Sequence, residues 1–171
     1  SAPTITYATF RGIIAPGACM TRTLPHDHTN ALAAAALVLE SGLATAADVQ
    51  AGLATFHHPP HRIEPLGTIG GVQWFNDSKA TSPHAALTAV RGFDRIVLLA
   101  GGLNKGLDLA SLASEHARVK AVVGLGTAAA DVTLPFQRFC PTRIAGSMAQ
   151  AVQLADELAE RFENYEPSDG D

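Results

Sequence analysis

The chain has 171 residues, 47% of them hydrophobic and 16% charged, and this composition argues against an intrinsically disordered protein. Its net charge is −4 and it has no basic run, which argues against nucleic-acid binding through a broad cationic face. No apolar stretch reaches the ~18 residues that a membrane span needs, and the first residues do not resemble a signal peptide. The two cysteines, Cys19 and Cys140, belong to no metal-binding motif and favour a reduced, cytoplasmic setting.

The first 60 residues predict short elements, and those within residues 1 to about 24 lack the apolar mass of a domain. Two strands and two helices are expected there, over residues 4–7, 12–15, 28–40 and 46–58. Ser41-Gly42 ends the first helix, which is rich in alanine, and a capping box from Thr45 to Asp48 opens the second.

A hairpin is predicted next, because Gly70-Gly71 separates two extended segments, 63–69 and 72–75. Pro65 confines the first strand to an edge. Helices and apolar strands then alternate: helix 85–90, strand 95–100, helix 109–118, strand 121–125, a short helix near 128, a weak segment at 138–140 and helix 147–162. Continuous apolar strands between helices indicate an α/β fold with a mostly parallel, Rossmann-like sheet and flanking helices.

The loop between the second hairpin strand and the next helix is the most informative segment. Ser82 as N-cap with Pro83 at the first helical position marks the start of that helix. Just before it, Asp77, Lys79 and Thr81 supply a carboxylate, an ammonium group and a hydroxyl. This arrangement suits phosphate, carboxylate or nucleotide binding, although an ordinary polar loop has the same residues and Asp77 with Lys79 could form a surface ion pair.

A second candidate loop, Gly101 to Gly106, follows the strand at 95–100. Ligands bind at the carboxyl ends of strands in open α/β sheets, where these glycines would let the backbone approach a ligand and Lys105 would meet a carboxylate. A flexible turn with a solvated lysine is the alternative. The chain contains no Gly-x-x-x-x-Gly-Lys-Ser/Thr phosphate-binding loop.

Asn30 and Arg62 are ambiguous on sequence alone. Asn30 could cap the alanine-rich helix or read an adenine edge, and Arg62 could belong to the edge of the hairpin or meet an anion. Several histidines lie close together and raise a metal-site hypothesis: His26, His28, His57, His58 and His61. Pro59-Pro60 breaks any helical spacing between them, so no metal site is predicted. His84 and His116 are expected on helix surfaces.

Four segments, taken together, resemble one family. They are His26–Ala34 (HDHTNALAA), Pro60–Glu64 (PHRIE), Trp74–Leu87 (WFNDSKATSPHAAL) and Leu99–Gly106 (LAGGLNKG). In order and approximate spacing they resemble the UDP-N-acetylmuramoylalanine–D-glutamate ligases of the Mur ligase family, over roughly residues 20–160. Other Mur ligases and the folylpolyglutamate synthetases carry an Asp-Tyr-Ala-His-type segment in place of the Asn-Asp-Ser-Lys-Ala-Thr run. Asp27 departs from the family, which more often has asparagine there.

The resemblance implies that residues 1–60 end a central ATPase domain and that residues 61–171 form the family's carboxy-terminal, Rossmann-like domain. It implies an ATP-dependent cytoplasmic ligase that uses Mg²⁺ and joins D-glutamate to UDP-N-acetylmuramoyl-L-alanine through an acyl phosphate, in the synthesis of peptidoglycan. The family's ATP or ADP contacts match Asn30, Arg62, Asp77 and Lys79. Its D-glutamate contacts match Thr81 and Lys105, and no residue is assigned as catalytic.

Parts of the family's active site have no counterpart in this sequence. The phosphate-binding loop and the UDP-sugar domain lie upstream in the family, so the chain alone is expected to be inactive, with ATP and Mg²⁺ held mainly by those absent parts. The family's last strand and its Ser-Pro-Ala segment are skipped after the helix that ends near Phe162. Two alternative functions therefore stay open: a non-catalytic nucleotide- or amino-acid-binding module, and a structural remnant.

Overall fold

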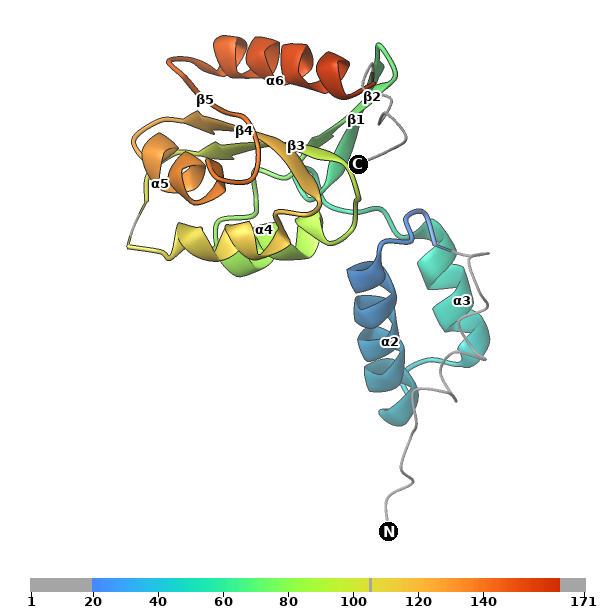
Figure 1. Cartoon of the computed structure of the whole chain (residues 1–171). Helices are drawn as coiled ribbons and strands as arrows, with labels where there is room; N and C mark the ends of the chain where they lie inside the picture. Colours follow the sequence, from blue (N-terminus) through green and yellow to red (C-terminus); the bar gives the residue numbers. More distant parts are fainter. Residues whose placement is uncertain (1–19, 105, 164–171) are drawn as a thin grey trace, which may run out of the picture. The chain divides into compact units, whose positions relative to one another are not determined.

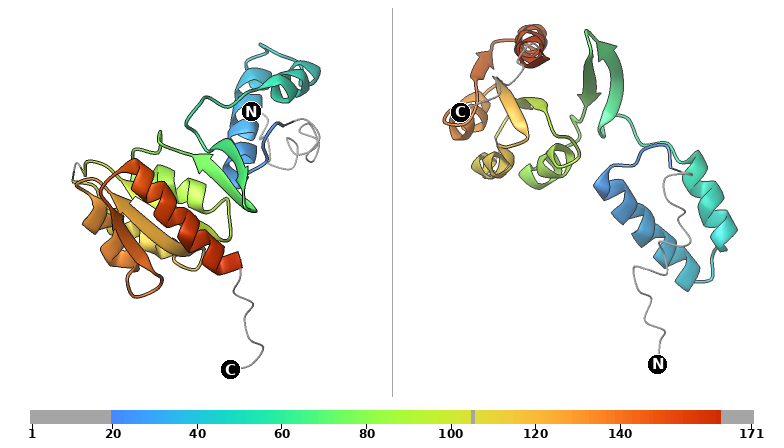
Figure 2. Two further views of the ribbon diagram at one scale, coloured as in Figure 1. Left: turned by 90° about the horizontal axis from the view of Figure 1, so that it is seen from above. Right: turned by 45° about the vertical axis from the view of Figure 1, so that its right-hand side comes forward.

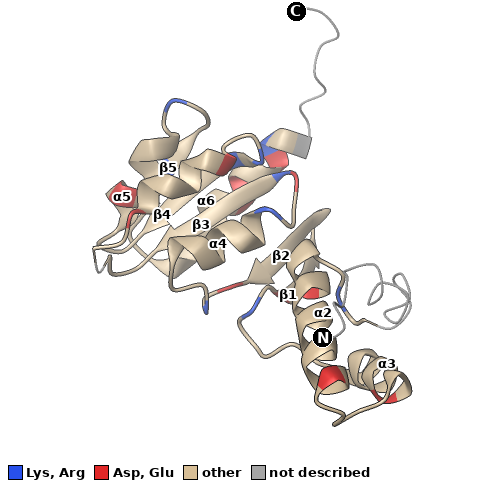
Figure 3. Ribbon diagram, turned by 90° about the horizontal axis from the view of Figure 1, so that it is seen from below, with Lys and Arg blue, Asp and Glu red and all other residues tan. Residues whose placement is uncertain are grey.

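The computed structural model describes residues 20–104 and 106–163 and divides the chain into two compact units, Ser1–Pro59 and Pro60–Asp171 (Figure 1). The strands predicted over residues 4–7 and 12–15 lie outside the described residues. Within the described ranges, no helix combines the length and the apolar character that a membrane span requires. Acidic and basic residues are interspersed over the ribbon, as Figure 3 shows.

In the first unit, helix α2 (Pro25–Glu40) begins earlier than the predicted start at His28 or Thr29. Pro25 occupies the first helical position, where its missing N–H costs no hydrogen bond. The carboxylate of Asp27 accepts the backbone N–H of Leu24 at 3.0 Å and so satisfies one of the unpaired donors at the helix start. The predicted start is too late because it follows the alanine run, whereas the proline marks the first turn of the helix.

Helix α3 (Ala46–Thr55) begins as predicted. The Thr45 hydroxyl accepts the Asp48 N–H at 3.3 Å, and the Asp48 carboxylate accepts the Thr45 N–H at 2.8 Å, which confirms the capping box. Small and branched side chains of α2 and α3 form the core of this unit: Ala31, Ala35 and Val49.

The second unit opens with the predicted hairpin. Strands β1 (Glu64–Ile69) and β2 (Val72–Asn76) pair antiparallel, with Glu64 opposite Asn76 and Ile69 opposite Val72. Gly70 and Gly71 have φ of 56° and 83°, and a tight turn with left-handed backbone at both central positions favours glycine there.

Three parallel strands form the central sheet, in the order β3-β4-β5: β3 (Ile96–Gly101), β4 (Val119–Leu125) and β5 (Thr142–Ala145). Helix α6 (Met148–Glu163) covers one face and helices α4 (Pro83–Val90) and α5 (Ala129–Thr133) lie on the other (Figures 1 and 2). Strand β4 is central and carries buried side chains on both faces. The α/β class and the parallel sheet predicted from the sequence are therefore confirmed.

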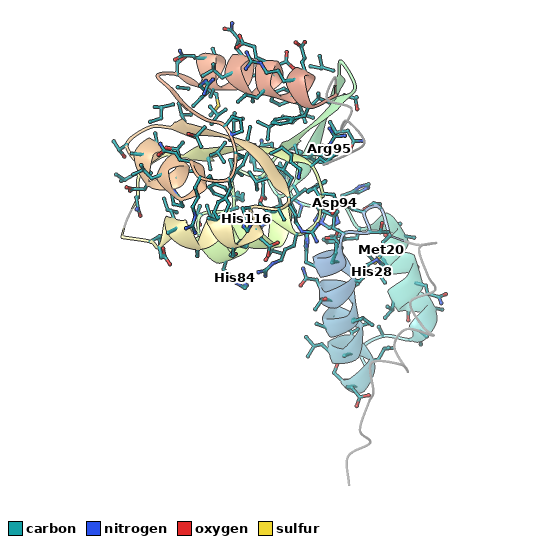
Figure 4. The ribbon with its side chains drawn as sticks, in the orientation of Figure 1. Met20, His28, His84, Asp94, Arg95 and His116 are labelled. Carbon is teal, nitrogen blue, oxygen red and sulfur yellow. The ribbon has the colours of Figure 1, made fainter. Side chains whose placement is uncertain are left out.

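The helix predicted over residues 109–118 is a shorter 3₁₀ helix, η1 (Leu109–Glu115). Local side-chain hydrogen bonds tighten its first turn, because the Asp108 carboxylate accepts the Ala110 N–H and the Ser111 hydroxyl donates to the Asp108 carbonyl. His116, labelled in Figure 4, follows η1 and stacks on Phe139 with 3.9 Å between the ring centroids.

The weak segment predicted at 138–140 does not form a strand. The Phe139 N–H instead donates to the Phe136 carbonyl at 2.8 Å, in a turn after the short 3₁₀ helix η2 (Leu134–Phe136). The strand begins after Pro141, whose carbonyl accepts the Val122 N–H at 3.0 Å and so starts the pairing of β5 with β4. This pairing depends on β4 and has no local signal in the sequence.

Helix α6 begins as predicted. The Ser147 hydroxyl accepts the Gln150 N–H at 3.2 Å, and the Gln150 side chain accepts the Gly146 N–H at 2.7 Å. Only part of its apolar stripe is buried. Ala151, Ala155 and Leu158 are buried, whereas Met148 and Val152 are 61% and 42% exposed.

Ser82→Ala tests the start of α4. The Ser82 hydroxyl accepts the Ala85 N–H at 3.3 Å, and losing an N-cap of this kind costs about 1 kcal/mol of the free energy of unfolding. Urea denaturation followed by the fluorescence of Trp74 measures the change. Ser114→Ala, which removes an exposed hydroxyl from η1, is the control, and an equal loss in both variants would contradict the capping role.

Candidate functional site

Two segments at the open end of the hairpin are joined by hydrogen bonds, and we call residues 61–64 and 76–81 the hairpin rim. The Ile63 N–H donates to the Asp77 carboxylate at 3.1 Å. The Lys79 N–H donates to the His61 carbonyl, also at 3.1 Å. These bonds bring the turn that carries Arg62 against the loop that carries Lys79.

The loop part of the rim is held by its own backbone bonds. The Ala80 N–H donates to the Asp77 carbonyl at 2.8 Å, and the Thr81 N–H donates to the Lys79 carbonyl at 2.9 Å. Lys79 and Thr81 are exposed, and the loop leads directly into the N-terminus of α4, whose partial positive charge favours anions. The loop therefore offers an ammonium group and a hydroxyl to solvent from a fixed backbone.

The turn part of the rim is conformationally strained. His61 has φ of 65° and Ile63 has φ of 49°, both in the left-handed region that favours glycine. A non-glycine residue held there costs about 1–3 kcal/mol, and such residues occur most often at ligand-binding and catalytic sites. Arg62 lies between these two residues.

Glu64 and Asn76 complete the rim, and no role was assigned to either from the sequence. Glu64, the first residue of β1, lies opposite Asn76, the last residue of β2. The Glu64 carboxylate accepts the His61 N–H at 2.9 Å, and Nδ2 of Asn76 lies 2.7 Å from Nδ1 of His61. The signal in the sequence was a polar residue at the outer end of each hairpin strand.

The second candidate loop is shaped by the neighbouring strand. A Cβ atom on Gly101 would lie 1.8 Å from the Leu125 carbonyl oxygen, and the Gly102 N–H donates to that same carbonyl at 2.8 Å. Gly101 is therefore required by the end of β4, and the interpretation that it admits a ligand lacks support. Asn104 donates to the Asp131 carboxylate at 3.0 Å, while Lys105 lies outside the described residues.

Asn30 belongs to the first unit, whereas the hairpin rim belongs to the second. It is exposed and lies inside α2, because that helix begins at Pro25. The capping role considered from the sequence is therefore wrong. Of the six residues expected to contact ligands, the structure joins Arg62, Asp77, Lys79 and Thr81 in one rim.

The first unit contains a charged cluster around Asp27, which is only 5% exposed. Arg22 donates to both carboxylate oxygens, at 2.8 and 2.7 Å, and Nε2 of His58 lies 3.8 Å from one of them. Burial raises the pKa of Asp27, but the hydrogen bonds and positive charge of Arg22 outweigh it and hold that pKa below its usual value. Burial and the charge of Arg22 lower the pKa of His58.

This cluster bears on the metal-site hypothesis, because it contains two of the histidines named there, His26 and His58. His26 lies next to Asp27 in the chain, with 3.4 Å between its Nε2 and the carboxylate, while His58 follows α3. Within residues 20–104 and 106–163, no group of three or more His, Cys, Asp or Glu side chains is arranged to hold a metal ion.

Comparisons with known proteins give many related sequences, although no family model matches the chain. A protein of Frankia casuarinae is 40% identical over 141 residues, which cover 80% of this chain and 30% of the relative. One of Myxococcus xanthus is also 40% identical, over 138 residues, which cover 80% of this chain and 30% of the relative. One of Corynebacterium efficiens is 33% identical over 160 residues, or 91% of this chain and 34% of the relative.

All three relatives are named UDP-N-acetylmuramoylalanine–D-glutamate ligase. The chain belongs to this ligase family. The resemblance drawn from four short segments is thereby confirmed over most of the chain. The chain spans about a third of the length of the curated relatives that it matches.

Proposed function

We propose that this chain is part of an ATP-dependent ligase that joins D-glutamate to UDP-N-acetylmuramoyl-L-alanine in peptidoglycan synthesis. Membership of the D-glutamate ligase family supports the reaction class. The observation that carries the local role is the hairpin rim, where Arg62, Asp77, Lys79 and Thr81 lie on two segments joined by hydrogen bonds. The chain contributes contacts to the nucleotide and to D-glutamate, and by itself it is expected to be inactive.

The rim suits the phosphates of a nucleotide. Arg62 and Lys79 supply two positive charges. Their segments are held together by the hydrogen bond that the Lys79 N–H donates to the His61 carbonyl. The Asp77 carboxylate accepts the Ile63 N–H, and because a carboxylate has several lone pairs it can also accept a bond from a ribose hydroxyl. When bound, ATP supplies the phosphoryl group that activates the substrate carboxylate.

We assign D-glutamate to Thr81 and Lys105, and the nucleotide also to Asn30. Thr81 is exposed beside the start of α4, which favours a carboxylate there. Most contacts to ATP and Mg²⁺, and those to the UDP-sugar, belong in this proposal to the larger part of the family's length that the chain does not span. Residues 1–60 would then end the central ATPase domain, residues 61–171 would form the carboxy-terminal domain, and the enzyme would be cytoplasmic.

Heteronuclear NMR tests the proposal on the purified chain. ADP and D-glutamate are titrated separately, while the backbone amides of residues 77–81 and 101–106 are followed. Localised, saturable shifts with ADP at the rim and with D-glutamate near Thr81 are expected, and L-glutamate is the control ligand. The absence of localised shifts at millimolar ligand would contradict the proposed contacts, and saturable binding without any effect of rim substitutions would favour the alternative of a different binding module.

Lys79→Ala is expected to weaken ADP binding about tenfold, because it removes a charge-assisted contact to phosphate. Lys120→Ala is the matched control. Lys120 lies near the amino end of β4 and donates to the Ala117 carbonyl at 2.8 Å, so ADP affinity should not change. Dissociation constants from the NMR titration check both expectations, and equal affinities for Lys79→Ala and the unmodified chain would remove Lys79 from the proposed site.

A further inference from the structure

The strained turn of the hairpin rim needs partners that keep it in place. His61 and Ile63 both have left-handed backbone conformations, which a β-branched residue such as Ile63 adopts rarely. The Ile63 side chain is 5% exposed, so its burial holds one end of the turn. The side chain of the other left-handed residue, His61, is exposed and cannot act in this way.

Contacts with Glu64, the first residue of β1, and Asn76, the last residue of β2, hold His61 instead. The Glu64 carboxylate accepts the His61 N–H at 2.9 Å and lies 3.5 Å from Nδ1 of the same residue. Nδ2 of Asn76 lies 2.7 Å from Nδ1 of His61 and 3.5 Å from the Glu64 carboxylate. The Asn76 side-chain oxygen also accepts the Ser78 N–H at 3.1 Å, which connects this group to the loop part of the rim.

The position of Arg62 depends on both of its neighbours. Its backbone is set by the left-handed residues on either side, and those are held by Glu64 with Asn76 on one side and by Asp77 on the other. If the Glu64 bond is lost, the Asn76 contact and the Lys79 N–H bond to the His61 carbonyl remain, and we expect them to be too weak to offset the cost of the left-handed conformation. The turn would then relax, and Arg62 would leave its position beside the loop that carries Lys79.

We propose that Glu64, together with Asn76, is a positioning residue that holds the turn at residues 61–63 and so fixes where Arg62 meets the phosphates of a nucleotide. This inference rests on the proposed nucleotide contact of Arg62. Glu64 acts through the backbone of His61 and does not itself touch the ligand. A free carboxylate at the edge of a phosphate site would repel the negatively charged ligand. The hydrogen bond that the Glu64 carboxylate accepts from the His61 N–H reduces this repulsion.

Glu64→Ala, Glu64→Gln and Glu157→Ala in the full chain test this role. Glutamine keeps an oxygen that can accept the His61 N–H, and Glu157 is an exposed glutamate of α6 whose carboxylate accepts from Gln153 at 3.2 Å. The backbone conformation is read from three-bond HN–Hα couplings and Cα and Cβ shifts of His61 and Ile63. ADP affinity is read from the NMR titration, with Arg62→Ala as the reference for loss of the contact.

For Glu64→Ala we expect loss of the left-handed signature at His61 and about tenfold weaker ADP binding, close to the effect of Arg62→Ala. Glu64→Gln should keep both properties, and Glu157→Ala should change neither. An unchanged turn in Glu64→Ala would overturn the inference. So would a relaxed turn with unchanged ADP affinity, because Glu64 would then have only a structural role.

The two proposals fail in different ways. If the unmodified chain binds no ADP, the proposed nucleotide contact fails, and the positioning role loses its ligand. The conformation of residues 61–63 in Glu64→Ala still decides separately whether Glu64 holds the turn. If ADP binds and Arg62→Ala has no effect, the inference is overturned while nucleotide binding by the rest of the rim stands.

Discussion

Replacing Gly101 by alanine should destabilise the second unit by about 3 kcal/mol, the upper range for overpacking a close contact. The added Cβ would lie 1.8 Å from the carbonyl oxygen and 2.7 Å from the carbonyl carbon of Leu125. Neither backbone can move away freely, because the Gly102 N–H donates to that carbonyl and β3 and β4 are paired up to this point. Urea denaturation followed by Trp74 fluorescence gives the change in the free energy of unfolding.

Gly102→Ala is the matched control for this substitution. Gly102 also has a left-handed backbone, with φ of 101°, but a Cβ there meets nothing within 4 Å. It therefore measures the cost of the backbone conformation alone, about 1 kcal/mol. If the two variants lose equal stability, the contact with Leu125 is not the reason for the glycine at position 101.

Asp27→Asn should cost the first unit about 2 kcal/mol at pH 7, because it leaves Arg22 without the carboxylate that it contacts through two hydrogen bonds. Asparagine retains an oxygen that can accept the Leu24 N–H, so the start of α2 is preserved. The loss of stability therefore measures the ion pair between Asp27 and Arg22. Urea titration followed by the amide peaks of α2 measures this unit separately. Glu40→Gln, at the exposed end of the same helix, is the control and should have little effect.

The pH dependence of this loss follows from the lowered pKa of Asp27. A carboxyl group with a pKa below its unfolded value of about 3.9 stabilises the fold above that pH, and the stabilisation disappears as pH falls through the folded pKa. The difference between Asp27→Asn and the unmodified chain should therefore be complete near pH 7 and shrink below about pH 4. A difference that stays constant down to pH 2 would show that the charge of Asp27 contributes nothing.

The sequence predicted the elements whose ends carry their own signals. Gly70-Gly71 marks the hairpin turn, Ser82-Pro83 opens α4, and Ser147 with Gln150 opens α6. Each signal acts through hydrogen bonds or backbone angles within a few residues, so it can be recognised without the rest of the fold. The apolar run of β4 likewise predicted a strand buried on both faces.

Two elements were missed or misassigned, one because it depends on a distant partner and the other because side-chain bonds change its first turn. Strand β5 has its ladder of hydrogen bonds because β4 lies beside it, and the residues Thr142–Ala145 carry no continuous apolar run. The 3₁₀ form of η1 depends on the side-chain bonds of Asp108 and Ser111, which compete with an α-helical first turn. Periodicity alone does not distinguish these outcomes.

The candidate site was predicted in part. Asp77, Lys79 and Thr81 were recognised because polar residues follow a strand and precede a capped helix, which is a local pattern. The bonds that join this loop to the turn at Arg62 could not be predicted, since they depend on the register that sets Glu64 opposite Asn76. The steric need for glycine at position 101 could not be predicted for a similar reason, because its close neighbour Leu125 is brought there by the pairing of β3 with β4.

The glycine turn at the tip of the hairpin has a consequence for the order of folding. It connects the two halves of the hairpin rim within a short length of chain, so closing the hairpin is enough to bring Glu64 against Asn76. Hairpins close within about 1–10 μs, whereas parallel strands must wait for their crossover connections. We therefore expect the rim to acquire its shape early and to keep it in partly folded chains whose parallel sheet is still incomplete.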